Sequence, residues 1–125
     1  MHLHGILYEP IRLKNYNGPL LHATDITPEF LQSCIDLPVY ISHDKTGPRI
    51  GRVCEVRTLE FNSVCVDIVC ENEKINTLLS TDTTYRGLSL ELNIEICKGG
   101  VIKNKHPTSV SIVKTCDTFN HYSII

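Results

Sequence analysis

The sequence predicts a single, mostly β domain over residues 1–125, a small antiparallel β-barrel with a few short helices. Short apolar runs recur along the chain, and turn residues separate them. The length suits one domain with one core. That core must consist mainly of Ile, Leu and Val, because the chain has no Trp, one Met and three Phe. Many short strands in this arrangement are typical of a sheet that curls into a barrel.

The first half of the chain predicts two strands and one helix. Thr27 suits a helix N-cap and Pro28 suits the first helical position, ahead of an apolar face. A Gly-Pro pair then punctuates a polar segment. In order, we expect a strand at 3–8, a helix at 27–35, a strand at 37–42 and a turn at 44–49.

The second half predicts a helix between further strands. The cleanest strand is 87–97, where Leu and Ile alternate with Ser89, Glu91 and other polar residues. Gly99-Gly100 predicts a two-residue hairpin turn after it, leading into Val101-Ile102. The remaining expected elements are strands at 50–57, 63–70 and 109–114 and a helix at 71–80.

Composition excludes several classes of partner. Apolar residues make up 42% and charged residues 21%, as in an average soluble protein. No run approaches the roughly 18 apolar residues of a membrane span, and residues 1–8 do not resemble a secretory signal. The net charge is −2 without a dense Lys/Arg cluster, so we expect neither a nucleic-acid nor a membrane partner.

The six cysteines predict buried free thiols. No CxxC pair occurs, and several cysteines take apolar positions in strand-like runs. Free thiols are typical of a reducing compartment. The close Cys/His spacing of a zinc site is missing, so no metal is expected. The cysteines are Cys34, Cys54, Cys65, Cys70, Cys97 and Cys116.

Ser89 and His43 are the candidate catalytic pair. Ser89 lies near the start of a strand whose opposite face is apolar, so a rigid element would hold its hydroxyl. A serine becomes a nucleophile when a base takes its proton, and histidine is the usual base. His43 ends one apolar strand and begins a polar turn, where a side chain can be exposed yet positioned.

Two segments resemble the herpesvirus capsid maturation protease (assemblin) family. LPVYISHDKTGPRIGRV, residues 37–53, is similar to the family's Leu-Pro strand, catalytic His, short turn and Gly-Arg/Lys-Val motif. GLSLEL, residues 87–92, resembles its nucleophile strand. The resemblance implies that His43 is the base and Ser89 the nucleophile. Residues 109–120, SVSIVKTCDTFN, are closer to the tailed-phage prohead proteases, which share this fold.

The resemblance implies a serine endopeptidase that works through an acyl-enzyme without a metal or organic cofactor. Its substrates would be scaffold and capsid proteins and the enzyme itself, inside an immature viral capsid in an infected host cell. A homodimer is a further possible partner. The chain is shorter than the herpesvirus enzymes, however, and we expect some of the helices that build their dimer to be missing.

The third catalytic residue stays open between His106 and Ser109. Alignment of SVSIV with the family strand places Ser109 in that position. Pairing through a Gly99-Gly100 turn predicts Ser89 opposite Val110 and Ser109 opposite Leu90. It also predicts His106 opposite Asn93, roughly 13 Å along the strand at about 3.3 Å per residue. His106 has the better chemistry for orienting a histidine base, and a bulge at Pro107 could bring it closer. Glu91 and His121 are set aside.

Two residues are candidates for the oxyanion site, and two other functions remain as rivals to the protease. Lys114 and Thr115 follow the last aligned strand, where a backbone N–H could stabilise an oxyanion. One rival is a catalytically inactive barrel that serves as a capsid scaffold or protein-binding domain. The other is a cysteine-based enzyme that uses Cys54 or Cys65, whose facing the sequence leaves uncertain.

Overall fold

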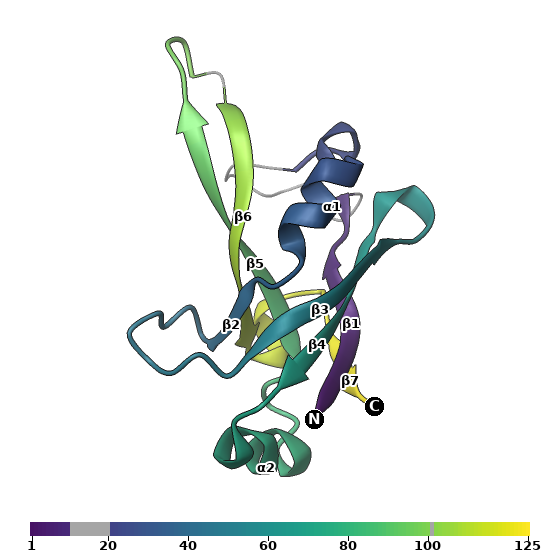
Figure 1. The fold of residues 1–125 in the computed structure, drawn as a ribbon, viewed down its shortest axis with the longest axis vertical. Coiled ribbons are helices and arrows are strands. Elements are labelled where there is room, and N and C mark those ends of the chain that lie inside the picture. The colour runs from purple at the N-terminus through teal and green to yellow at the C-terminus, as the bar shows by residue number, and fades with distance from the viewer. Residues whose placement is uncertain (11–20, 101) are drawn as a thin grey trace.

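One curled sheet of seven strands forms the body of the protein (Figure 1). The computed structural model describes residues 1–10, 21–100 and 102–125. The strand order is β5-β6-β2-β3-β4-β1-β7. The fold is mostly β with short helices, as the sequence predicts. The strands are β1 (His2–Tyr8), β2 (Pro38–Ile41), β3 (Gly51–Thr58), β4 (Val64–Cys70), β5 (Gly87–Ile96), β6 (Ile102–Val113) and β7 (Tyr122–Ile124).

Each of the two α-helices that the structure describes begins directly after a residue whose side chain caps its first turn. Helix α1 (Pro28–Cys34) begins after Thr27, whose Oγ1 accepts a hydrogen bond from the Phe30 amide at 3.1 Å. Helix α2 (Glu73–Thr81) begins after Asn72, which caps the Ile75 amide in the same way. The predicted start at residue 71 is therefore two residues early. Short 3₁₀ turns lie at Ala23–Asp25, Glu60–Asn62 and Thr115–Asp117.

One pair of neighbouring strands is parallel, in an otherwise antiparallel sheet. Strand β2 runs beside β6 with Val39 opposite Val110 and Ile41 opposite Ile112. Its other neighbour, β3, is antiparallel. The parallel pairing brings the end of β2 next to the end of β6, although nearly seventy residues separate them in sequence (|i−j| = 68 for His43 and Ser111).

The sheet curls into a half-barrel that closes at one end. Strand β7, which the sequence did not predict, pairs with β1, and the residues just before it reach the start of β5. The Leu88 amide donates to the Asn120 carbonyl at 2.8 Å, and the Tyr122 amide donates to the Arg86 carbonyl at 3.0 Å. The two edges of the sheet thus meet near Gly87, just before the position of Ser89.

The β5–β6 hairpin differs from the predicted register. The predicted pair of Asn93 with His106 is confirmed. Nearer the barrel, however, Ser89 lies opposite Ser111 and Glu91 lies opposite Ser109, so the predicted partners Val110 and Leu90 are wrong. The physical reason is a bulge between Glu91 and Leu92, which adds one residue to β6 and shifts the pairing by one.

The turn of this hairpin also differs from the prediction. The Gly100 amide donates to the Cys97 carbonyl at 3.1 Å, so Lys98 and Gly99 are the central residues of the turn. Val101 lies outside the described residues. Strand β6 begins at Ile102 rather than at the predicted residue 109.

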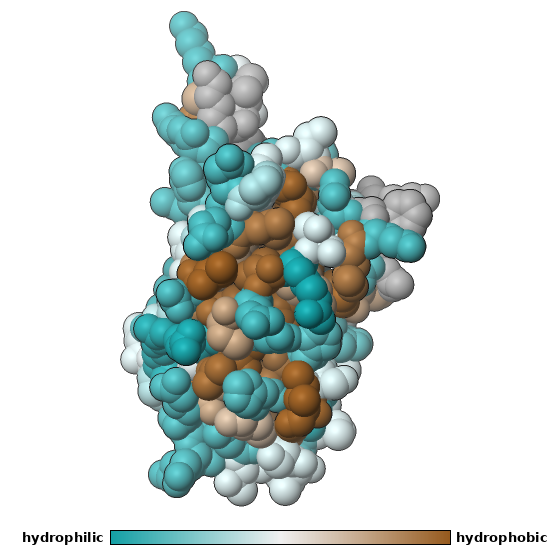
Figure 2. All heavy atoms as spheres, turned by 45° about the vertical axis from the view of Figure 1, so that its right-hand side comes forward, coloured by the Kyte–Doolittle hydropathy of each residue, from teal (hydrophilic) through white to brown (hydrophobic). Residues whose placement is uncertain are grey.

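The core lies on the concave side of the sheet, where α1 packs (Figure 1). Leu88, Val110 and Ile112 are completely buried there. Ile96 has the same facing by alternation, yet 67% of it is exposed because the hairpin extends beyond the barrel. On the side of the molecule that lies to the right in Figure 1, apolar side chains run along the middle of the surface with hydrophilic ones between them (Figure 2). Within the described parts of the chain, no helix is long and apolar enough to cross a membrane.

The cysteines divide into buried and accessible thiols, all of them free. Cys34, Cys65 and Cys70 are buried as predicted, whereas Cys54 and Cys97 are only partly buried and Cys116 is exposed, so the prediction of burial is wrong for these three. Burial raises the pKa of the Cys34 thiol to about 12 and that of Cys70 to about 11. Since the thiolate is the reactive form, these two thiols should be inert in the folded chain.

Alkylation of the folded chain with iodoacetamide at neutral pH should therefore label Cys116 first and leave Cys34 and Cys70 unmodified. Peptide mass spectrometry over a time course measures the order. Chemical unfolding should then expose both buried thiols and remove the difference. Fast labelling of Cys34 in the folded chain would contradict the packing described above.

Candidate active site

The loop after β2 holds His43 in a strained backbone conformation against β6. Ser42 and His43 both have positive φ, 51° and 60°, which is uncommon outside glycine. The Ser42 amide donates to the Ile112 carbonyl at 2.9 Å, and the His43 amide donates to Ser111 Oγ at 3.0 Å. Backbone strain of this kind concentrates at functional sites.

Asp44 closes the same loop from within. Its Oδ1 accepts hydrogen bonds from the Thr46 amide and hydroxyl and from the Gly47 amide. The hydrogen bonds from Thr46 hold the pKa of the Asp44 carboxyl below its usual range. The turn that the sequence predicts at 44–49 is thus an internally bonded loop, which supports the position of His43.

Four polar side chains gather where β5 and β6 pair, on the face of the sheet away from the core. Antiparallel register places Ser89 opposite Ser111 and Glu91 opposite Ser109. Opposite residues lie on the same face, with Cβ atoms about 4.5–5.5 Å apart. Ser109 and Ser111 are buried even though they are polar. We call Ser89, Glu91, Ser109 and Ser111 the β5–β6 polar patch.

The polar patch brings the predicted nucleophile and the predicted base to one face. Ser111 is the common neighbour, because it lies opposite Ser89 and its hydroxyl accepts the His43 amide hydrogen bond. Among the described residues, no hydrogen bond joins the Ser89 hydroxyl to the His43 ring. Such catalytic bonds are often long or absent without substrate.

Glu91 is the carboxylate of this site. Its Oε2 lies 3.5 Å from His43 Nδ1, and Ser109 Oγ donates to the same oxygen at 3.4 Å. Its Oε1 forms a salt bridge with Lys45. Lys45 holds the pKa of the Glu91 carboxyl below its usual range, and His43 adds to this effect. Glu91 is not among the catalytic residues that the resemblance implies, although its spacing of two residues from Ser89 predicts a shared face of the strand.

The two candidates for a third catalytic residue lie in different places. His106 is exposed opposite Asn93, four residues along β5 from Ser89, or roughly 13 Å. A bulge does lie beside Pro107, but His106 still pairs with Asn93, so the bulge does not bring His106 to Ser89. Ser109 lies within the polar patch, where it contacts Glu91.

The predicted oxyanion residues follow β6. The Thr115 amide donates to the Thr84 carbonyl at 2.7 Å, and Thr115 Oγ1 accepts from the Arg86 amide. Thr115 is therefore engaged in holding the segment before β5. Lys114 is exposed and directly follows Val113, the partner of Gly87. His121 lies with its Nε2 2.9 Å from the carbonyl oxygens of Thr115 and Thr118.

Cys65 belongs to a second constellation, on β1 and β4. Its Sγ lies 3.5 Å from His4 Nε2, and His4 Nδ1 bonds to Asp67. Asp67 has a lowered pKa because of this bond. The order thiol, imidazole, carboxylate matches that of cysteine hydrolases, but only 2% of Cys65 is exposed, so a peptide cannot reach it. Cys54 donates to the Asp67 carbonyl. In the described part of the chain, no group of His, Cys, Asp and Glu side chains is arranged to hold a metal ion.

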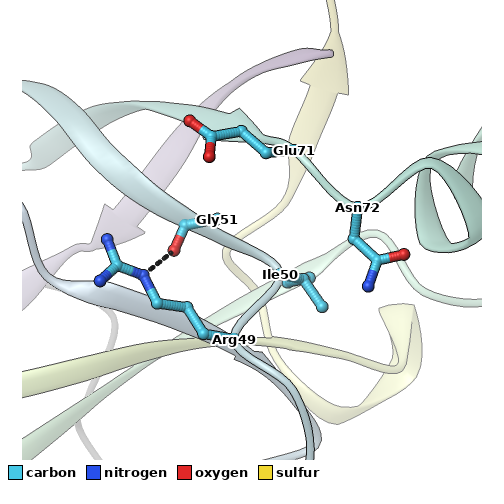
Figure 3. Close-up of a pocket in the computed structure, with 5 residues that line it drawn as sticks. All are labelled: Arg49, Ile50, Gly51, Glu71 and Asn72. Carbon is cyan, nitrogen blue, oxygen red and sulfur yellow. Dashed lines mark hydrogen bonds between the residues drawn. The ribbon is translucent and has the colours of Figure 1, made fainter.

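A pocket of about 480 Å³ lies at the start of β3 (Figure 3). Arg49, Ile50, Gly51, Glu71 and Asn72 line it. The Arg49 guanidinium donates from Nε to the Gly51 carbonyl at 3.0 Å. The pocket contains none of the predicted catalytic residues.

Comparison with known proteins identifies similar structures but no similar sequences. No protein-family model and no curated protein sequence matches the chain. The protease of Kaposi's sarcoma herpesvirus bound to an allosteric inhibitor matches with a TM-score of 0.55 and 14% identity, covering 99% of this chain and 76% of that one. A complex of that protease with a hexapeptide phosphonate inhibitor gives 0.53 and 14%, covering 99% and 65%. The chain thus has the fold of a herpesvirus protease.

Proposed function

We propose that this chain is a serine endopeptidase in which Ser89 is the nucleophile and His43 the general base. One observation carries the proposal: Ser111 lies opposite Ser89 and accepts the His43 amide hydrogen bond, and the His43 ring contacts Glu91, two residues from Ser89 on the same face of β5. The strained backbone at His43 and the likeness to a protease fold support it.

The reaction is an acyl transfer in two stages. His43 takes the proton of the Ser89 hydroxyl as Oγ attacks the carbonyl carbon of a peptide bond. The C–N bond then breaks, and the leaving amine receives that proton from the His43 imidazolium. Water next attacks the acyl-enzyme, again with His43 as base, which frees the second product and restores Ser89. The backbone N–H of Lys114 is the proposed oxyanion donor.

The proposed substrates are proteins of an immature viral capsid. The resemblance of residues 37–53 and 87–92 to assemblins and the fold together favour scaffold proteins, capsid proteins and the chain itself as substrates. The proposed setting is the capsid interior in an infected cell, a reducing compartment. Self-association as a homodimer is part of the same proposal.

A fluorophosphonate probe tests the nucleophile directly, because it phosphonylates an activated serine. We expect the probe to label Ser89, located by mass spectrometry of the labelled peptide, and to label the His43→Ala variant at least about 10²-fold more slowly. The matched control is His106→Ala, which replaces an exposed histidine of the same hairpin and should label at the normal rate.

Two results would overturn the proposal. One is the absence of label on Ser89 in the folded chain, which would favour the catalytically inactive barrel. The other is equal labelling with and without His43. Labelling of Ser89 should also be unchanged in Cys54→Ser and Cys65→Ser, which separates this function from a cysteine-based one.

A further inference from the structure

We propose that Glu91 is the residue that orients the His43 imidazole, so that the nucleophile and its orienting carboxylate lie on one strand, two residues apart. The inference rests on the proposed serine peptidase function and names the missing third member of its site. Glu91 takes this role instead of His106 or Ser109, the two candidates for the third catalytic residue that the sequence left open.

The contact with Nδ1 is the geometric basis. A carboxylate next to Nδ1 favours a proton on that nitrogen, which leaves the lone pair of Nε2 to accept the proton of a serine hydroxyl. Glu91 Oε2 lies 3.5 Å from His43 Nδ1. This is an ion-pair contact rather than an aligned hydrogen bond, and such contacts tighten when substrate binds.

The Glu91 carboxylate is held at both oxygens. Lys45 binds Oε1, while Ser109 donates to Oε2, the oxygen that faces the ring. Ser109 is 2% exposed, so its hydroxyl has little access to water. Ser109 is therefore a positioning residue that acts through Glu91. This role explains how a serine can occupy the position that the family resemblance gives to the third catalytic residue.

The charges of the site suit this role. His43 becomes cationic when it takes the serine proton, and Glu91 is the anion beside it. The charged residue that opposes this effect is Lys45, which neutralises Glu91 from the far oxygen and repels an imidazolium. Because Lys45 and His43 bind different oxygens, both can contact the carboxylate at once. Removal of Lys45 should therefore act in the direction opposite to removal of Glu91.

His106 lacks these contacts. It is exposed beside Asn93, and the described structure gives it no bond to His43 or to any residue of the polar patch. Glu91 lies two residues from Asn93 on β5, on the same face and nearer to Ser89. It makes the contact with the His43 ring that His106 would need in order to orient that ring.

The test is the pH dependence of peptide cleavage by Glu91→Gln, measured on a peptide library by counting new amino termini. We expect kcat to fall on the order of 10²-fold with KM unchanged, because a Gln amide can donate to Nδ1 and favour the wrong tautomer. The acidic limb of the profile should move to lower pH. Lys45→Gln should move that limb to higher pH, and Glu91→Asp should recover part of the loss.

The matched control is Glu95→Gln, the same change on the same strand at an exposed position, which should leave kcat and the profile unaltered. If Glu91→Gln does not fold by circular dichroism, the Lys45→Gln shift and a smaller kcat loss in Ser109→Ala decide instead. Normal kcat and an unmoved profile in Glu91→Gln, with cleavage still dependent on Ser89, would overturn the inference alone. Cleavage that survives Ser89→Ala would overturn the proposed function.

Discussion

Ser89→Ala should abolish peptide cleavage, with a loss of roughly 10⁴- to 10⁶-fold in the rate at which new amino termini form. The reason is that the acyl-enzyme needs the Ser89 oxygen, and no other hydroxyl of the polar patch can take its place. Ser109 donates to Glu91, and Ser111 accepts from the His43 amide, and both are buried. Only background hydrolysis should remain. The measurement is the peptide-library assay described above, together with self-cleavage of the chain by intact-mass analysis.

A matched serine variant distinguishes catalysis from damage to the fold. Ser123→Ala makes the same change at an exposed position of β7 and should retain full activity. Both variants should unfold at the wild-type denaturant concentration, because Ser89 is only half-buried and the hydroxyl contributes little to packing. Retention of more than a tenth of the activity by Ser89→Ala would exclude it as the nucleophile.

Leu88→Ala should have the largest effect on stability, about 2–5 kcal/mol. Leu88 is fully buried, packs in the core and lies opposite Ile112, which is also fully buried. The deleted atoms would leave a cavity directly beneath the strand that carries Ser89. Since small domains are stable by only about 5–15 kcal/mol, the loss should be evident as a lower midpoint in urea unfolding followed by circular dichroism.

Ile96→Ala is the control on the same strand. Its side chain is largely exposed near the tip of the hairpin, so the expected loss is within about 0.5 kcal/mol. Equal losses at both positions would mean that the hairpin tip packs against the body of the protein. Activity should fall in Leu88→Ala only to the extent that the variant unfolds.

The sequence predicted the features that depend on neighbouring residues. Thr27 and Pro28 mark the start of α1, because a cap and its helix are adjacent in the chain. The alternation in residues 87–97 gave the facing of Ser89 and Glu91, because side chains alternate sides along any strand. The alternation did not predict that Ile96 is exposed, because the burial of a side chain depends on which other elements cover that face of the strand.

Tertiary structure decided which faces meet and in what register. The bulge beside Glu91 shifts the pairing by one residue and so places Ser111, not Val110, opposite Ser89. A single-residue shift exchanges the polar and apolar faces of a strand. Local pattern does not reveal such an insertion, since Thr108 is an ordinary strand residue whose hydroxyl bonds to the Glu91 carbonyl.

The sequence by itself determined that Ser89 stands on the polar side of a strand and that His43 ends another. Only the tertiary structure decided that β2 lies parallel to β6, which sets the His43 backbone on Ser111 and the His43 ring beside Glu91. The physical reason is that strand pairing joins backbone groups that are distant along the chain. Its free energy depends on the packing of the whole barrel, which no local pattern of residues contains.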